Sequence, residues 1–290
     1  MIRLQTAATE EDYRSILRLE STLCSLNPER WHFHFGGIGF ERYMFGNGAA
    51  DFFIYGHILL QRDAVIGYAL IYREECEYRV GLLPQYAVLY PEIVAAIEKE
   101  FPAGSEFRTD VNNYDAELCR ALLNAGYKKG AESRFQAVFD LRTPQVGVQP
   151  FHGHLAVLEE ADIPERVRYA ALPTGASITA EMFEAYLRSA DCQNVLDYVF
   201  RTEEGAFAGY LSWWMDRDSN TVMLNPVACV EQYRKRGYTQ AAISQGLQIL
   251  KEKGFAFAYV DTGMRNLPAK NLYQKAGFLQ SGMVYRYSKE

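Results

Sequence analysis

The sequence has no long apolar run and no excess of positive charge. No window approaches the roughly 18 consecutive apolar residues that span a bilayer, so we expect no transmembrane helix. The 36 acidic residues outnumber the 30 basic residues and give a net charge of −6, without a long block of either sign. Nucleic acid and anionic membranes are therefore poor candidates as partners.

Cysteine is scarce, and no two cysteines form a CxxC pair. The five cysteines are Cys24, Cys76, Cys119, Cys192 and Cys229. The N-terminal MIRLQTAATEED leads directly into a helix signature and has none of the features of a cleavable secretory signal. We therefore expect a reduced, cytoplasmic protein.

The sequence also lacks the motifs of common hydrolases, NTPases and metalloenzymes. GxSxG, HExxH and GxxxxGK(S/T) are absent. The histidine pairs His32/His34 and His152/His154 have no cysteine or acidic partner at zinc spacing. We interpret them as surface or strand residues and expect no metal site.

What is present is a chain long enough for two domains, with a weak internal repeat. The 290 residues, 49% of them hydrophobic, suffice for two domains of about 140 residues. Each half begins with a capped helix signature, TEEDYRSILRLES near residue 10 and EEADIPERVRYAAL near residue 160. Paired strands follow and share a Gly-Tyr dipeptide, at 67–68 and 209–210.

Further matches continue the repeat. A Gln-Tyr at 85–86 and 232–233 precedes a helix in each half, and LCRALLNAGY corresponds to KNLYQKAGF. We predict an α/β fold, with a mixed sheet and crossover helices in each of two tandem domains at 1–142 and 152–290. The segment 143–151 contains two prolines and a glycine and is the predicted linker. Chance similarity between two α/β domains is the alternative to a true repeat.

One strand of the second half contains a proline. The run TVMLNPVACV reads as a buried strand, but Pro226 cannot donate to a ladder. A central strand tolerates proline at a bulge or where it separates from its neighbour. Such a separation leaves backbone groups in need of a partner, which a ligand can supply.

The segment YRKRGYT, which follows this strand, opens a helix predicted to run to about Lys253. Free N–H groups at a helix start and the positive end of its dipole bind anions, and Gly237 lets a phosphate approach the backbone. The alternative is a solvated basic turn, because three consecutive cations cannot all face one ligand. After a further strand, NLPAKNLYQKAGF places Ala269, Leu272 and Tyr273 at helical spacing and ends at Gly277.

Together, YRKRGYT and NLPAKNLYQKAGF resemble the acyl-CoA signature of the GNAT superfamily of N-acetyltransferases. That signature runs Arg/Gln-x-x-Gly-x-Gly/Ala and then Asn-x-x-Ala-x-x-Leu-Tyr-x-x-x-Gly-Phe. The resemblance is sharpest over 221–278 and weaker in the first half. The tandem layout with a degenerate first copy is similar to that of mycothiol synthase and its relatives.

The resemblance implies acetyl-CoA as cosubstrate and a small-molecule amine as acceptor. It places the pyrophosphate among Arg234, Lys235, Arg236, Gly237, Tyr238 and Thr239. It further implies that backbone groups of Val227 and Cys229 hold the acetyl and pantetheine part, and that Asn266 hydrogen-bonds the cofactor. Tyr273 would protonate the departing thiolate, because a phenol is protonated at neutral pH.

This sequence departs from the family pattern at Thr239, where glycine or alanine is usual. Its side chain could crowd the cofactor or donate to a phosphate. In the first half Tyr90 replaces the glycine, Pro91 removes a helix N–H group, and Leu122 replaces the tyrosine. We therefore predict that the first domain binds no acyl-CoA in the usual manner and helps to shape the substrate cleft.

The general base is open at this stage. Asn225 on the strand cannot serve as one, and Asp191, Asp197 and Asp216 are candidates, each with a surface role as the alternative. Cys229 has no histidine partner, so we expect no covalent acyl-enzyme.

The sequence leaves one rival function in place, a catalytically silent acyl-CoA-binding or scaffold protein. An aminoacyl-tRNA-dependent transferase is disfavoured by the acidic balance.

Overall fold

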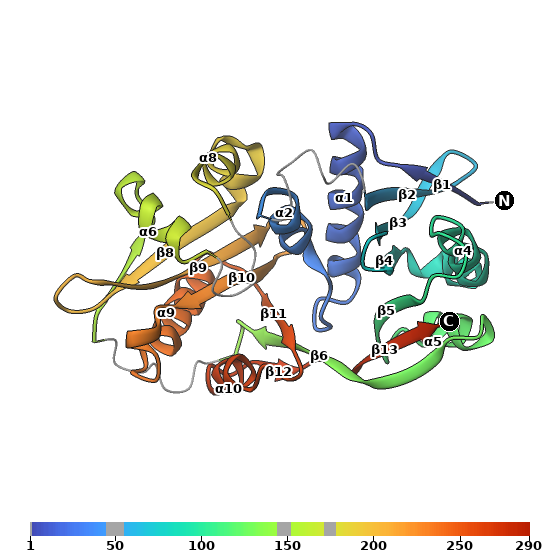
Figure 1. Cartoon of the computed structure of the whole chain (residues 1–290). Helices are drawn as coiled ribbons and strands as arrows, with labels where there is room; N and C mark the ends of the chain where they lie inside the picture. Colours follow the sequence, from blue (N-terminus) through green and yellow to red (C-terminus); the bar gives the residue numbers. More distant parts are fainter. Residues whose placement is uncertain (1, 45–54, 144–151, 171–177) are drawn as a thin grey trace.

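A computed structural model describes residues 2–44, 55–143, 152–170 and 178–290 (Figure 1). The elements of the first half are β1 Ile2–Thr6, α1 Glu10–Leu26, α2 His34–Met44, β2 Gly56–Gln61, β3 Ala64–Tyr72, β4 Glu77–Leu82, the 3₁₀ turn η1 Pro84–Leu89, α4 Tyr90–Glu98, β5 Phe107–Asn112, α5 Ala116–Asn124 and β6 Lys128–Asp140.

The second half repeats this order. Its elements are β7 His154–Val157, η2 Glu160–Asp162, α6 Ile163–Arg168, α8 Ala180–Arg188, η3 Ala190–Asn194, β8 Val195–Arg201, β9 Phe207–Asp216, β10 Thr221–Cys229, η4 Glu231–Tyr233, α9 Tyr238–Glu252, β11 Phe257–Gly263, α10 Leu267–Lys275, β12 Leu279–Gln280 and β13 Val284–Lys289. The predicted α/β fold with a mixed sheet is confirmed.

Local chemistry sets the helix boundaries that the sequence predicted. Thr9 and Asp12 form a capping box at the start of α1, in which each side chain bonds the other residue's backbone N–H. The α5 and α10 helices end in the same turn, with Gly126 and Gly277 at positive φ. In α10 the N–H of Phe278 donates to the carbonyl of Tyr273 at 3.0 Å, and α5 closes with the equivalent bond.

One continuous sheet runs through both halves, in the order β1-β2-β3-β4-β5-β13-β6-β11-β10-β9-β8-β7. The helices divide between its faces. Residues of α1, α2 and α8 share a core with Trp214 and Tyr259, whereas α9 and α10 pack with Trp213 and Val260 on the opposite face. Adjacent strand residues therefore serve separate cores.

The two halves exchange strands. The C-terminal strand β13 lies between β5 and β6 of the first half, and the later part of β6 pairs with β11 of the second half. Both chain termini consequently lie in the first half (Figure 1). The domain boundaries stay a prediction, and residues 144–151 of the predicted linker lie outside the described residues.

The helix α2 of the first half lies over β9 and β10 of the second (Figure 1). It carries three glycines, and its buried residues belong to the same core as Trp214. The site beside β10 is thus framed by both halves. Within the described residues, no helix is long and apolar enough to cross a membrane.

Candidate active site

The strand β10 separates from β11 beyond Met223. The two strands pair in parallel only over Thr221–Met223, and the register of β10 against β9 shifts between Leu224 and Val227. Pro226 lies within this shift, which confirms the bulge predicted from it. The facing backbone edges of β10 and β11 are therefore unpaired next to the bulge, and we call this separation the slot.

The backbone groups of Val227 and Cys229 face this slot. The N–H of Val230 donates to the carbonyl of Ala208 on β9 at 2.9 Å. Because backbone polar groups alternate sides along a strand, those of Val227 and Cys229 point away from β9. The Arg234 guanidinium bonds the Cys229 carbonyl at 3.2 Å from that open side.

The helix α9 begins with free donors. Its N-cap is Gly237, at φ 88°, and the space where a β-carbon would stand is open to 4 Å. Asp115 and Asn266 cap α5 and α10 with their side chains, but Gly237 has none to offer. Within the described residues, no acceptor bonds the amides of residues 238–240, which therefore form a site for an anion.

The three cations beside this helix start are exposed. Arg234, Lys235 and Arg236 make no ion pair with any described residue. Arg236 lies over the ring of Tyr233 at 5.8 Å. Their charge is available to a polyanion, while the helix amides supply the directional contacts.

Thr239 lies in the first turn of α9 beside Cys229. Burial raises the pKa of the Cys229 thiol, and the Thr239 hydroxyl and the Arg234 guanidinium oppose that shift. A thiol with a raised pKa is a weak nucleophile, which agrees with the expectation of no acyl-enzyme.

The second predicted segment forms α10. Asn266 is its N-cap: the side-chain oxygen accepts from the N–H of Ala269 at 3.4 Å, and the amide donates to Thr262 at 3.1 Å. Its side chain is thus already bonded within the protein. Tyr273 is buried against Phe278, with ring centroids 6.1 Å apart. Burial, and then the charge of Asp261, raise the pKa of Tyr273 well above its ordinary value, so the phenol keeps its proton.

Comparison with family models identifies the second half. Residues 164–278 match the acetyltransferase (GNAT) family, and this range contains the β10 slot, the α9 start and α10. The matched segment is similar to a GNAT domain, and we refer to it by that name. The family match supports acyl transfer from an acyl-CoA. The comparison with curated proteins found no similar sequence.

Solved GNAT structures share the whole fold. An acetyltransferase from Colwellia psychrerythraea is 10% identical over 99% of this chain and 100% of its own, with a TM-score of 0.64. A GCN5-related N-acetyltransferase from Sphaerobacter thermophilus is 13% identical over 100% and 95%, with a TM-score of 0.60. A tandem GNAT protein from the clavulanic acid biosynthesis pathway is 13% identical over 100% and 98%, with a TM-score of 0.59. At these identities the likeness shows a shared tandem fold.

The three aspartates considered as bases in the GNAT domain are buried and have partners. Asp191 accepts from the Tyr13 hydroxyl at 2.8 Å and forms an ion pair with Arg14. Asp197 accepts from the Tyr186 hydroxyl at 2.8 Å, and Asp216 closes a turn. These hydrogen bonds and the ion pair indicate structural roles. The alternative of a surface role is also wrong, because each of the three side chains is less than a tenth exposed.

A buried polar cluster of the first half was missed because its members are distant in sequence. Glu20, Cys24 and His32 bring potential ligand atoms within 4.8 Å of one another. Glu20 accepts from the Tyr68 hydroxyl at 2.6 Å and the His34 N–H at 3.1 Å. Burial, and then the charge of Glu20, raise the pKa of the Cys24 thiol well above its ordinary value. This favours the protonated thiol, and the expectation of no metal stays a prediction.

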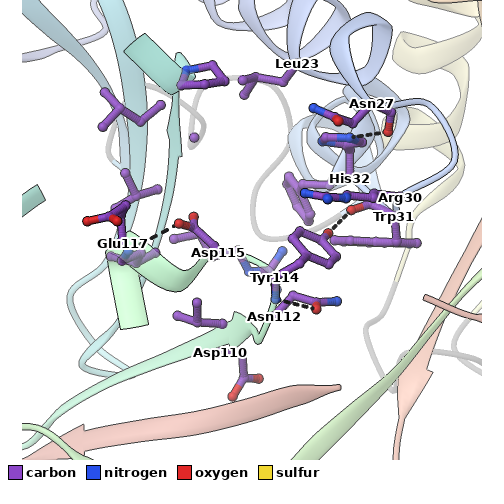
Figure 2. A pocket seen from close by; sticks show the side chains of 18 of the residues that line it. Leu23, Asn27, Arg30, Trp31, His32, Asp110, Asn112, Tyr114, Asp115 and Glu117 are labelled. Carbon is purple, nitrogen blue, oxygen red and sulfur yellow. Dashed lines mark hydrogen bonds between the residues drawn. The ribbon is translucent and has the colours of Figure 1, made fainter. Parts of the chain in front are cut away.

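The first half has its own opening between parallel strands. The strands β4 and β5 are in register only at Glu77 and Arg108, and a cavity of about 480 Å³ lies where they separate. Figure 2 shows Asp115 on one side and Asn27 and His32 on the other, with the Tyr114 ring reaching toward Trp31 and Arg30. Sequence reasoning predicted that this half helps to shape a cleft, but not that it holds a cavity.

Proposed function

We propose that the protein is an N-acetyltransferase that transfers the acetyl group of acetyl-CoA to a primary amine by direct attack. The start of α9 carries the proposal: its amides have no acceptor in the described part of the chain, Gly237 leaves open space, and exposed cations flank it. This is the chemistry that a pyrophosphate requires.

The proposed roles follow the arrangement of the slot. Residues 234–239 would bind the pyrophosphate, and backbone groups of Val227 and Cys229 would bind the pantetheine and the acetyl carbonyl. Asn266 would contact the cofactor from the start of α10, which requires it to share or give up a capping bond. Since Tyr273 keeps its proton, it can serve as the acid.

The reaction needs no covalent intermediate. The amine nitrogen forms a bond to the acetyl carbon while backbone N–H groups near Val227 stabilise the oxyanion. The carbon–sulfur bond then breaks, Tyr273 protonates the thiolate, and the amine proton leaves through water. We also place the protein in a reducing, cytoplasmic compartment, because all five cysteines are unpaired.

The cofactor site is tested by calorimetry with acetyl-CoA on Gly237→Glu. A carboxylate at the helix start would repel the pyrophosphate, and we expect binding to weaken at least about 100-fold. Gly254→Glu is the matched control, because Gly254 at the other end of α9 has φ 85° and equally open space. Equal affinity of the two variants would refute the site.

A thiol-release assay distinguishes the proposed enzyme from a catalytically silent acyl-CoA-binding protein. A silent protein would bind acetyl-CoA but release no thiol with any amine, whereas the proposed enzyme releases thiol with at least one amine of a broad panel.

A further inference from the structure

The cavity in the first half occupies the position that the cofactor slot has in the second. Both lie between two parallel strands that pair briefly and then separate, β4 from β5 and β10 from β11. In the first half, however, α4 starts at Tyr90 and Pro91 without a cation, and the Tyr90 hydroxyl donates to Asp115 at 2.8 Å. The phosphate site is lost, but the space is kept.

Negative charge dominates the cavity wall. Arg79 is neutralised by Glu41 at 3.2 Å and Arg134 by Asp261 at 2.9 Å. The carboxylate of Asp115 lines the cavity and forms no ion pair with a described lysine or arginine. The same is true of Glu20, which is 2% exposed. Glu20 is buried and Asp115 is half-buried, and neither has a counter-ion among the described residues, which favours a cationic ligand.

Two further acids and one cation on the wall do not change this balance. Asp110 pairs with Arg286 at 2.9 Å, and Figure 2 shows its side chain pointing away from the space. Glu117 is exposed and pairs with Arg120. Arg30 lies at the exposed rim over the Tyr114 ring, where water screens its charge.

Aromatic side chains form much of the remaining wall. Phe33, Tyr68, Tyr90 and Tyr114 all line the cavity. Aromatic faces attract cations and also accept an apolar body, so they suit an organic amine better than a metal ion.

The cavity also reaches the GNAT domain. Asp261 lines it from β11, two residues beyond the last pairing of β11 with β10. Asp261 thus links the cavity wall to the strand that borders the reaction slot. We infer that a ligand in the cavity can reach toward this slot along β11.

We propose that this cavity captures the acceptor, a small primary amine with an apolar or aromatic body, whose ammonium group is bound by Asp115 and Glu20. This inference rests on the proposed acetyl transfer and assigns its second substrate to the half that has lost the cofactor site. The degenerate half thus binds one substrate and the GNAT domain the other.

The test is calorimetry with phenethylamine and butylamine on the full chain, alone and with saturating acetyl-CoA. We expect saturable binding of at least one amine under both conditions. The neutral isostere 2-phenylethanol should bind at least about tenfold more weakly, because it cannot use the carboxylates. Absence of amine binding, or equal binding of the isostere, overturns the proposal.

Asp115→Asn is the sharpest variant. Asparagine still caps α5 through its one side-chain oxygen, and its NH2 group can donate to the Tyr90 hydroxyl oxygen in place of the bond that Asp115 accepts, so the fold is kept while the charge is lost. Amine affinity should fall about tenfold or more. The control is Glu117→Gln on the same helix, which should leave amine affinity unchanged. Equal affinity of the Asp115→Asn variant and the unmodified protein also overturns the proposal.

The two proposals fail separately. Gly237→Glu should abolish acetyl-CoA binding and leave amine binding intact, and Asp115→Asn should do the reverse. If acetyl-CoA binds but no amine does, the acceptor site is wrong and the cofactor site stands. If amines bind but acetyl-CoA does not, the proposed function fails.

Discussion

At the scale of single residues, Tyr273 is the side chain that we propose as the general acid. It is buried, and both burial and Asp261 hold its pKa above the ordinary value. Tyr273→Phe should lower kcat by about 100-fold or more, since a positioned acid contributes that much, and leave the Kd for acetyl-CoA within about twofold. A thiol-release assay measures kcat, and calorimetry measures the Kd for acetyl-CoA.

The pH dependence gives a second measure of Tyr273. Because its pKa is raised, the phenol stays protonated, and kcat should show no loss attributable to Tyr273 up to about pH 10. The control is Tyr127→Phe, which removes a buried hydroxyl of the first half that bonds Tyr78 at 3.0 Å. A Tyr273→Phe enzyme with unchanged kcat would exclude Tyr273 as the acid.

The residues proposed to bind the cofactor lie in two short segments, so their local backbone structure could be predicted. The φ of Gly237, the bulge at Pro226 and the end of α10 at Gly277 follow from local rules, and the structure shows all three. The cavity could not be predicted, because Glu20, Asp115 and Asp261 meet only through contacts between distant strands and helices. No spacing pattern in the sequence indicates that these three residues come together.

At the scale of elements, the packing of α2 on Trp214 couples the halves. Gly36 has no room for a β-carbon, which would stand 2.3 Å from the Trp214 β-carbon. Trp214 cannot move freely, because its indole N–H bonds the Asn225 carbonyl at 2.6 Å. Gly36→Ala should therefore cost about 1–3 kcal/mol of unfolding free energy and weaken acetyl-CoA binding as the bulge shifts.

Denaturant unfolding and calorimetry test this coupling. The control is Gly37→Ala, whose β-carbon would meet only the Phe33 ring at 3.2 Å and should stay within about 1 kcal/mol of the unmodified protein. Equal stabilities of the two variants would show that Trp214 can shift to accommodate the added β-carbon.

Helix α2 also shows why some helices cannot be predicted from the sequence. Its run HFGGIGFERYM contains three glycines, which disfavour helix by about 1 kcal/mol each. Gly36 and Gly39 pack closely against Trp214 of the other half, so tertiary contact overrides local propensity. The hairpins, by contrast, are recognisable because their turns and strands are contiguous in sequence.

At the scale of the whole molecule, strand exchange predicts one cooperative unit. Val284 and Tyr287 of β13 are nearly fully buried in the first half. Ending the chain after Met283 should remove both, with a loss of about 3 kcal/mol or more, and lower the Tm of the entire protein. Ending it after Lys289 is the control and should change little.

Tryptophan fluorescence can follow the halves separately, since Trp31 lies in the first and Trp213 and Trp214 in the second. Single-tryptophan variants should give coincident unfolding curves. Two well-separated transitions would mean that the halves unfold independently.

The strand exchange also limits which parts of the chain can be removed. Deletion of either half would strip a strand from the other, since β13 pairs with β5 of the first half and β6 pairs with β11 of the second. The half without a phosphate site is therefore indispensable to the fold, whatever its cavity binds.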